Sequence, residues 1–277
     1  MSIGAIKKRS VHYGLNTITY VIVIGALFPL VWLLMTALKT GADAFAYPPV
    51  WFFEPTFENF QKVLSQPTFV KSYLNSLIVV LGTTFFSLFF GITSGYSLAR
   101  NNTKIGNFMG LWIILARMAP PMGFALPLYI ILRQIGLLNT HIALILVYMT
   151  ITLPFITWLM MGFFKRIPIE IEEAARIDGC TRIQTLFRVV IPSSLPGIAT
   201  CAIFSFIMSW NEFFYALIIS GRETRPASVE IQGFISFEGI NWGELAAASI
   251  LVILPVLIFT MFAQKGLISG LTQGSSK

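Results

Sequence analysis

Six long apolar stretches alternate with polar segments along this chain of 277 residues. A helix needs about 20 predominantly apolar residues to cross the hydrocarbon layer of a membrane, and each stretch reaches that length. The predicted spans are residues 17–38, 74–99, 108–132, 142–164, 197–220 and 242–268. An even number of spans places both termini on the same side. The pattern therefore predicts an all-α integral membrane protein with one transmembrane domain over residues 1–277.

A polar segment, residues 165–196, separates the fourth and fifth predicted spans. Pro168 suits the first turn of a helix, and the acidic residues Glu170, Glu172 and Glu173 follow it where the positive end of the helix dipole favours them. Gly179 is placed to end this helix in the left-handed conformation. The segment therefore begins with a short helix outside the membrane.

A second short helix is predicted directly after the first. Thr181 and Gln184 have the spacing of a capping box, apolar residues follow at helical intervals, and Pro192 is expected to end the helix. Two short, capped helices between membrane spans form a soluble projection. Such a projection is suited to docking another protein.

The first short helix is predicted to have two different faces. Residues 171, 174 and 175 are apolar and share one face at 100° per residue, whereas Glu172, Glu173 and Arg176 share the other. We expect the apolar face to pack closely and the charged face to meet solvent or a partner.

Composition and charge support a membrane location. The chain is 56% hydrophobic and 11% charged, with a mean hydropathy of +0.77, which is more apolar surface than a soluble domain of this size buries. Twelve Lys and Arg residues fall on the side of the termini against six on the other, so the termini and residues 165–196 are predicted to be cytoplasmic. The net charge of +7 reflects this topology and not a nucleic-acid partner. The first stretch lacks a cleavage site and is predicted to be a retained anchor.

Small residues and prolines mark helix contacts and bends. Ser87, Gly91 and Gly95 recur every four residues in the second span, a spacing that lets helix backbones approach. Prolines also interrupt most spans, which membrane helices tolerate beside other protein or a water-lined cavity. The pair Pro120 and Pro121 is the best candidate for a flexible bend that lines a substrate path.

Two charged residues, Arg117 and Glu212, lie inside predicted spans, where they must face the bundle interior, a partner or water. Trp210, Asn211 and Glu212 together offer an aromatic ring, an amide and a carboxylate, which suit sugar hydroxyls. The alternative is that these residues only hold neighbouring helices together. The sequence leaves both interpretations open.

Motor and catalytic chemistry is missing from the sequence. No phosphate-binding loop of the type Gly-x-x-x-x-Gly-Lys-Ser/Thr occurs, so the chain is not expected to hydrolyse ATP. No metal-ligand spacing occurs, and Cys180 and Cys201 imply no disulfide framework. We therefore expect no catalytic residue and no cofactor or metal in this chain.

The ordered motifs of this chain resemble a known family. Glu173-Ala174-Ala175, Asp178-Gly179 and Val189-x-Ile191-Pro192 match the EAA signature of ABC-importer permease subunits. Supporting matches extend over nearly the whole chain and are most similar to the carbohydrate-uptake branch. They are Asn75-Ser76-Leu77, Pro127-Leu128, Gly136-Leu137-Leu138-Asn139-Thr140, Trp210-Asn211-Glu212-Phe213 and Gly270-Leu271-Thr272-x-Gly274.

The resemblance implies a fold, partners and a role for residues 165–196. In that family this loop carries the coupling helix, which sits in a cleft of a cytoplasmic ATPase dimer that binds ATP and Mg. The expected coupling residues are Glu172, Glu173, Ala174, Ala175, Asp178 and Gly179. The other expected partners are a second permease, an extracytoplasmic solute-binding protein and membrane lipid, in a bacterial inner membrane. The last outer loop, residues 221–241, reaches toward the captured sugar in that family.

Other classes remain open. A secondary active solute carrier would need internal repeats or buried ligands for a coupling ion, and an intramembrane enzyme would need a nucleophile and a base placed together. The sequence does not identify the sugar. We also expect residues 226–238 of the outer loop to lie outside the packed bundle, because the loop is polar.

Overall fold

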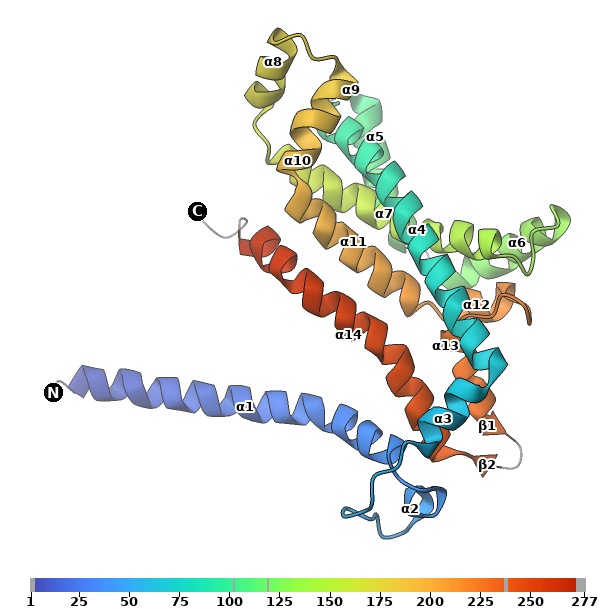
Figure 1. Ribbon diagram of the computed structural model, residues 1–277. Helices are drawn as coiled ribbons and strands as arrows, with labels where there is room; N and C mark the ends of the chain where they lie inside the picture. The colour runs from blue at the N-terminus through green and yellow to red at the C-terminus, as the bar shows by residue number, and fades with distance from the viewer. Residues whose placement is uncertain (1–2, 102, 119, 237–238, 273–277) are drawn as a thin grey trace. The chain divides into compact units, whose positions relative to one another are not determined.

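The computed structural model describes residues 3–101, 103–118, 120–236 and 239–272, and these residues are helical almost throughout (Figure 1). The chain divides into two compact units. The first comprises Met1–Pro67 and Ile231–Leu251, and the second comprises Thr68–Glu230 and Val252–Lys277. The described strands, β1 (Ile235–Ser236) and β2 (Gly239–Ile240), are two residues long and pair antiparallel. The predicted all-α class is confirmed.

The first unit contains the N-terminal helix and the segments that follow it. Its helices are α1 (Ile3–Ala37), α2 (Gly41–Phe45), α3 (Glu58–Ser65), the 3₁₀ helix η2 (Ile231–Phe234) and the first part of α14 (Trp242–Thr272). Asn59 of α3 is buried and donates from its amide to the carbonyl oxygens of Ala37 and Lys39, at 2.9 and 2.7 Å. These bonds fix α3 against the end of α1.

The second unit contains most of the membrane helices and the segment predicted to project from them. Its elements are α4 (Pro67–Arg100), α5 (Lys104–Met118), α6 (Pro121–Gln134), α7 (His141–Lys165), α8 (Ile169–Ile177), α9 (Arg182–Thr185), the π-helical turn η1 (Leu186–Val190), α10 (Ile191–Ser193), α11 (Leu195–Trp210), α12 (Phe214–Ile219) and α13 (Ala227–Glu230). The core lies around α7, on which α5, α11 and α12 pack. Leu144, Ile156, Met160 and Phe164 of α7 are fully buried.

Small residues bring α4 and α7 close together, as the sequence pattern predicts. A Cβ atom added to Gly91 would lie 2.5 Å from Cγ2 of Ile156, and one added to Gly95 would lie 2.9 Å from Cβ of Met160. The hydroxyls of Ser87 and Thr152 share a buried hydrogen bond of 2.6 Å in the same interface. Close approach compensates for the missing hydrophobic driving force between helices in lipid.

The helices of the structure divide the predicted spans differently in two places. Within the described residues, α1, α4, α7 and α14 are long and apolar enough to cross a membrane, and a fifth span is formed if Arg182–Ser193 and Leu195–Trp210, bent by 79°, count as one. The predicted span 108–132 is divided between α5 and α6, which meet near Pro120. The predicted span 197–220 is interrupted between α11 and α12, where Asn211 and Glu212 follow the last turn of α11.

Candidate functional site

The first candidate surface is residues 165–196, the segment expected from the family resemblance to be the coupling loop and given that name below. It folds largely as its capping signals predict. Helix α8 begins directly after Pro168 and ends at Ile177, two residues before Gly179, whose φ of +91° is left-handed. The amide of Cys180 donates to the carbonyl of Ala175 at 3.0 Å, and that of Gly179 donates to Arg176 at 3.1 Å. This pair of bonds is a Schellman motif, which satisfies the last carbonyls of the helix.

The second helix of the loop is confirmed at its start and differs at its end. Thr181 and Gln184 form the complete capping box, with bonds of 3.3 and 2.9 Å. The prediction that Pro192 ends the helix is wrong, because the chain passes through a π-helical turn and continues to Ser193. Proline fits here because it occupies the first turn of α10, where its missing N–H is not needed.

Glu172 is not on an exposed charged face, which corrects the expectation for α8. Its side chain is buried, 5% exposed, and Arg100 at the end of α4 donates to its Oε1 from Nε at 2.7 Å and from Nη2 at 2.6 Å. Tyr96 donates to its Oε2 at 2.7 Å, and Arg100 also donates to the carbonyl of Ile167 at 3.0 Å. A buried carboxylate is stable when it is paired and hydrogen-bonded in this way.

The face of α8 that is exposed combines apolar and charged residues. Ile177 is 86% exposed and Ile183 of the next helix is 70% exposed, and Glu173 and Arg176 lie beside them. Ala174, Asp178 and Gly179 are also exposed, and Ala175 is half-buried. Between these helices lies a hollow of about 480 Å³, lined by Glu173, Arg176, Ile177, Cys180, Thr181 and Arg182. Exposed isoleucines beside charges are typical of a protein-docking surface.

The candidate substrate-path residues are only partly brought together. Glu212 follows the break after α11 and accepts a hydrogen bond at Oε1 from the amide of Tyr215, at 2.8 Å. The hydroxyl of Tyr215 donates to the carbonyl of Pro121 at 3.2 Å. Tyr215 therefore connects the start of α12 to the first residue of α6, a connection that the sequence did not reveal. The carboxylate of Glu212 itself caps the first turn of α12.

Trp210 is a core residue in this structure. It is 4% exposed, its Nε1 donates to the carbonyl of Val252 at 2.9 Å, and its ring stacks on Phe206 with a centroid distance of 5.6 Å. The ring therefore offers no face to a sugar, which corrects that expectation. Asn211 is exposed and donates to the carbonyl of Ile207, Pro120 is exposed, and the side chain of Arg117 lies outside the described residues.

A second surface is formed by residues 221–230, which belong to the loop predicted to lie outside and are called the outer segment below. The bonds that hold this segment in place were not predicted. Asn75 of α4 donates to the carbonyls of Glu223 and Arg225 at 3.0 and 3.1 Å, and Ser76 accepts from the amide of Ala227 at 2.8 Å. Ala227 and Val229 are buried. The expectation that residues 226–238 lie outside the packed bundle is therefore wrong for residues 226–230.

Further bonds hold the start of the outer segment to the α6–α7 turn. Asn139, in the left-handed conformation at φ +60°, accepts at Oδ1 from the amide of Gly221 at 2.9 Å and from the hydroxyl of Thr224 at 2.8 Å. Lys71 forms an ion pair with Glu223, which holds the pKa of that carboxyl below its usual range. In the sequence, the only signal for this arrangement was that Asn75 and Asn139 each lie in one of the motifs shared with the family.

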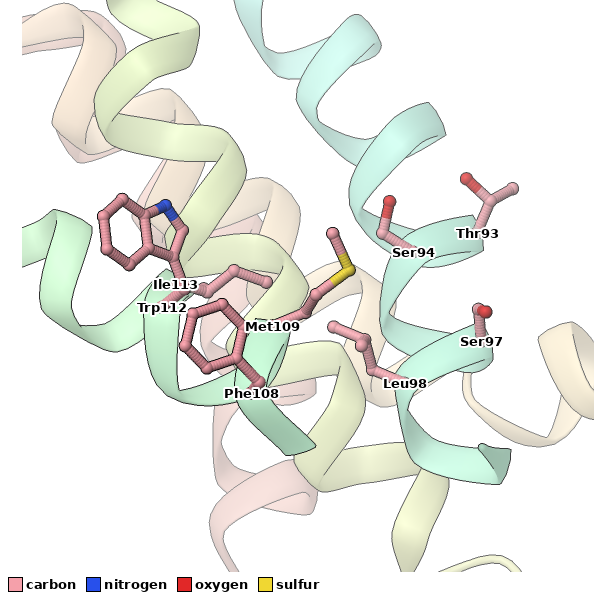
Figure 2. Close-up of a pocket in the computed structure, with 8 residues that line it drawn as sticks. All are labelled: Thr93, Ser94, Ser97, Leu98, Phe108, Met109, Trp112 and Ile113. Atoms are coloured by element: carbon pink, nitrogen blue, oxygen red, sulfur yellow. The ribbon is translucent and has the colours of Figure 1, made fainter. Parts of the chain in front are cut away.

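A groove of about 880 Å³ lies between α4 and α5. Figure 2 shows Thr93, Ser94, Ser97 and Leu98 of α4 on one side and Phe108, Met109, Trp112 and Ile113 of α5 on the other. The hydroxyl of Thr93 donates to carbonyls of its own helix, at 3.1 and 3.0 Å. None of the eight lining residues is charged, and we assign the groove no ligand. Across the described part of the chain, no group of three or more His, Cys, Asp or Glu residues is arranged to hold a metal ion.

The comparisons with known proteins agree with one another. Residues 87–273 match the family described as the binding-protein-dependent transport system inner membrane component. The diacetylchitobiose uptake system permease protein DasC of Streptomyces coelicolor is 36% identical over 264 residues, which cover 95% of this chain and 96% of DasC. The sulfoquinovosyl glycerol transport system permease protein SmoH of Agrobacterium fabrum is 36% identical over 262 residues, which cover 93% and 91% of the two chains.

A solved structure supports the same fold. One chain of a bacterial ABC transporter involved in the import of the acidic polysaccharide alginate aligns with a TM-score of 0.80 at 22% identity, covering 94% of this chain and 97% of that one. The similarity in structure shows that the fold is that of an ABC-importer permease. The family match spans most of the chain and includes the coupling loop. The chain therefore belongs to the family of inner membrane components of binding-protein-dependent transport systems.

Proposed function

We propose that this chain is one permease subunit of an ATP-driven importer for a sugar or sugar derivative. It forms half of the translocation path with a second permease, receives substrate from an extracytoplasmic binding protein, and couples to a cytoplasmic ATPase dimer that binds ATP and Mg. The sugar class rests on relatives such as DasC and SmoH, which are named for the uptake of sugar compounds. The specific substrate is left open by this similarity.

One observation carries the proposal for the ATPase side. The coupling loop exposes Ile177, Ile183 and Glu173 while Glu172 is bonded to α4 behind them. A surface with exposed apolar residues and a rigid attachment is suited to transmit force from a partner, whereas a flexible loop would absorb it. We infer that the ATPase dimer covers this surface, and that ATP-driven closure of the dimer shifts the equilibrium between inward-open and outward-open states.

The leading alternative is a secondary active carrier, which transports without an ATPase. Affinity purification of the tagged chain from its native membrane separates the two. We expect a nucleotide-binding subunit and a second permease to co-purify, and we expect ATP hydrolysis by the complex to rise when the sugar-loaded binding protein is added. Purification of the chain alone, with sugar uptake driven by an ion gradient in vesicles, would establish the carrier instead.

The topology prediction follows from the same proposal. Reporters fused after Lys104, Arg188 and Lys277 should show a cytoplasmic location, and reporters after Thr56 and Thr224 an exterior one, because the excess of basic residues lies on the side of the termini. Activity of paired cytoplasmic and exterior reporters is the measurement. An exterior signal after Arg188 would remove the coupling loop from the ATPase and end this proposal.

A further inference from the structure

Helix α4 contacts both candidate surfaces, one near each end. Asn75 and Ser76 bind the outer segment, and Arg100 and Tyr96 bind Glu172 of the coupling loop. Figure 1 shows α13 beside one end of α4 and the α8–α9 projection beyond the other. Asn75 and Arg100 are 25 residues apart (100 − 75), which at about 1.5 Å per residue is about 37 Å along the helix axis.

Helix α4 is also built to be stiff. It runs for 34 residues, and residues 68–100 contain no proline. The other described helices of span length contain one each inside the helix: Pro29 in α1, Pro154 in α7 and Pro255 in α14. Interior proline removes a backbone hydrogen bond and bends a helix. α4 therefore transmits a displacement along its length better than these neighbours.

The hydrogen bonds at the two ends of α4 fix α8 and the outer segment in position against it. At the inner end, the buried carboxylate of Glu172 receives hydrogen bonds from Arg100 and Tyr96, so moving α8 away from α4 would leave a charge unpaired. At the outer end, one amide side chain, Asn75, binds two carbonyls of the outer segment, those of Glu223 and Arg225, and also bonds to His141 at 2.8 Å. Neither end is free to slide along its partner.

We propose that α4 is the rigid element that links the outer segment to the coupling loop, with Asn75, Ser76, Tyr96 and Arg100 as its positioning residues. The inference rests on the proposed function, because it takes the outer segment as the side that the binding protein approaches and the coupling loop as the side that the ATPase covers. Contact of the loaded binding protein with one end thereby biases the position of the other.

A single link through α4 and two independent contacts predict different losses for a variant in which both ends are broken. If the signal passes through α4, breaking either end disconnects it, and breaking both adds no further loss. If each contact only stabilises its own loop, the two losses multiply. The outer variant is Asn75→Ala with Ser76→Ala, and the inner variant is Glu172→Gln. Their matched controls are Ser94→Ala with Ser97→Ala on the exposed side of α4, and Glu170→Gln on the exposed side of α8.

The experiment uses the complete purified complex in proteoliposomes, with sugar uptake measured per mole of complex. We expect the outer and inner variants each to lose about tenfold in uptake stimulated by the loaded binding protein, and the combined variant to lose about tenfold as well. Both controls should stay at the wild-type level. A loss near a hundredfold in the combined variant, or wild-type uptake in either single-end variant, would overturn the inference.

A second experiment leaves both ends intact. Phe85 and Phe86 lie in the middle of α4 and are 64% and 42% exposed. The pair Phe85→Gly and Phe86→Gly softens the helix, whereas Phe85→Ala and Phe86→Ala removes the same rings and keeps it stiff. We expect the glycine pair to lower stimulated uptake at least about fivefold relative to the alanine pair. Equal uptake by the two pairs would refute α4 as a link, whereas a wild-type complex without ATP-dependent uptake would refute the proposed function.

Discussion

The coupling loop and the outer segment are both fixed to α4, but by different chemistry. The coupling loop is held mainly by a buried ion pair between the side chains of Arg100 and Glu172, and Arg100 adds one bond to the carbonyl of Ile167. The outer segment is held mainly through its backbone, because Asn75 binds the carbonyls of Glu223 and Arg225 and Ser76 binds the amide of Ala227, with an exposed ion pair between Lys71 and Glu223 beside them. A side-chain pair requires a particular residue on each side, whereas a backbone clamp leaves the side chains of the held segment free.

This difference suits the proposed roles of the two surfaces. A coupling loop has to meet the same ATPase in every cycle, so a fixed residue in the loop carries no disadvantage. An outer segment that meets a sugar-loaded binding protein needs side chains whose identity can vary to match that partner. Glu223 and Arg225 are exposed although their backbone is fixed. A rigid backbone with exposed side chains is the arrangement that recognition loops on a stable scaffold use.

The largest effect is expected from separating α4 from α7, which both surfaces depend on. A Cβ atom at Gly95 would lie 3.0 Å from the carbonyl oxygen of Thr157 and 3.1 Å from the amide nitrogen of Met161, backbone atoms that cannot turn aside. Gly95→Leu should therefore destabilise the helix pair by about 3 kcal/mol or more, because overpacking forces backbone shifts. The measurement is the yield and melting temperature of the detergent-solubilised complex.

The matched control for Gly95 lies on the partner helix. Gly162 of α7 has nothing within 4 Å of an added Cβ atom. Gly162→Leu should keep the yield and melting temperature of the wild type. Equal loss in the two variants would show that added bulk in the membrane, and not the α4–α7 contact, causes the effect.

A smaller and more selective effect is expected from the exposed face of α8. Glu173 is exposed and lies beside Ile177, whereas Glu172 one residue earlier is buried. Glu173→Lys should insert normally in the membrane and weaken association with the ATPase by about tenfold, or about 1.4 kcal/mol, through charge reversal at the interface. The amount of ATPase subunit that co-purifies is the measurement. Glu170→Lys, also exposed on α8, is the control.

A third effect concerns only the direction of the coupling loop. An added Cβ atom at Gly179 would meet nothing within 4 Å, so any cost of substitution arises from its φ of +91°. Gly179→Val should cost about 1–2 kcal/mol, because L-residues disfavour the left-handed conformation. Loss of coupled uptake with normal membrane insertion is expected. Gly179→Asn should retain most activity, since asparagine enters this conformation more readily, and equal loss in both variants would contradict the backbone explanation.

The capping and packing signals of the coupling loop were readable from the sequence because they are local. The capping box of Thr181 and Gln184 and the left-handed Gly179 each act over a few residues, whereas the small-residue spacing of Gly91 and Gly95 in α4 marked a close helix contact without identifying α7 as the partner. The burial of Glu172 was not readable. Helical periodicity groups it with Glu173, and the partner that reverses its environment, Arg100, lies 72 residues away in the sequence.

The burial of the outer segment could not be predicted from local sequence either. Its polar composition predicts an exposed loop, yet Ala227 and Val229 are buried, because Asn75 and Ser76 satisfy backbone groups that would otherwise need water. Those partners lie about 150 residues away in the sequence. Local periodicity contains no information on such pairs. Likewise, the burial of Trp210 depends on Val252 of α14, so the aromatic motif alone did not reveal its role.

The smallest effect is expected from Gly221, where the outer segment is attached to Asn139 instead of to α4. A Cβ atom at Gly221 would lie 2.4 to 2.7 Å from the amide atoms of Asn139, which accepts a hydrogen bond from the Gly221 backbone. Gly221→Ala should push Asn139 aside and cost about 1 kcal/mol, seen as a melting temperature lower by about 2–4 °C. Gly233→Ala, where an added Cβ atom meets nothing within 4 Å, is the control.

Because Asn75 and Ser76 remain in place in Gly221→Ala, most of the stimulated uptake should persist. Complete loss of uptake in Gly221→Ala would place the critical contact of the outer segment at Asn139 instead of at α4.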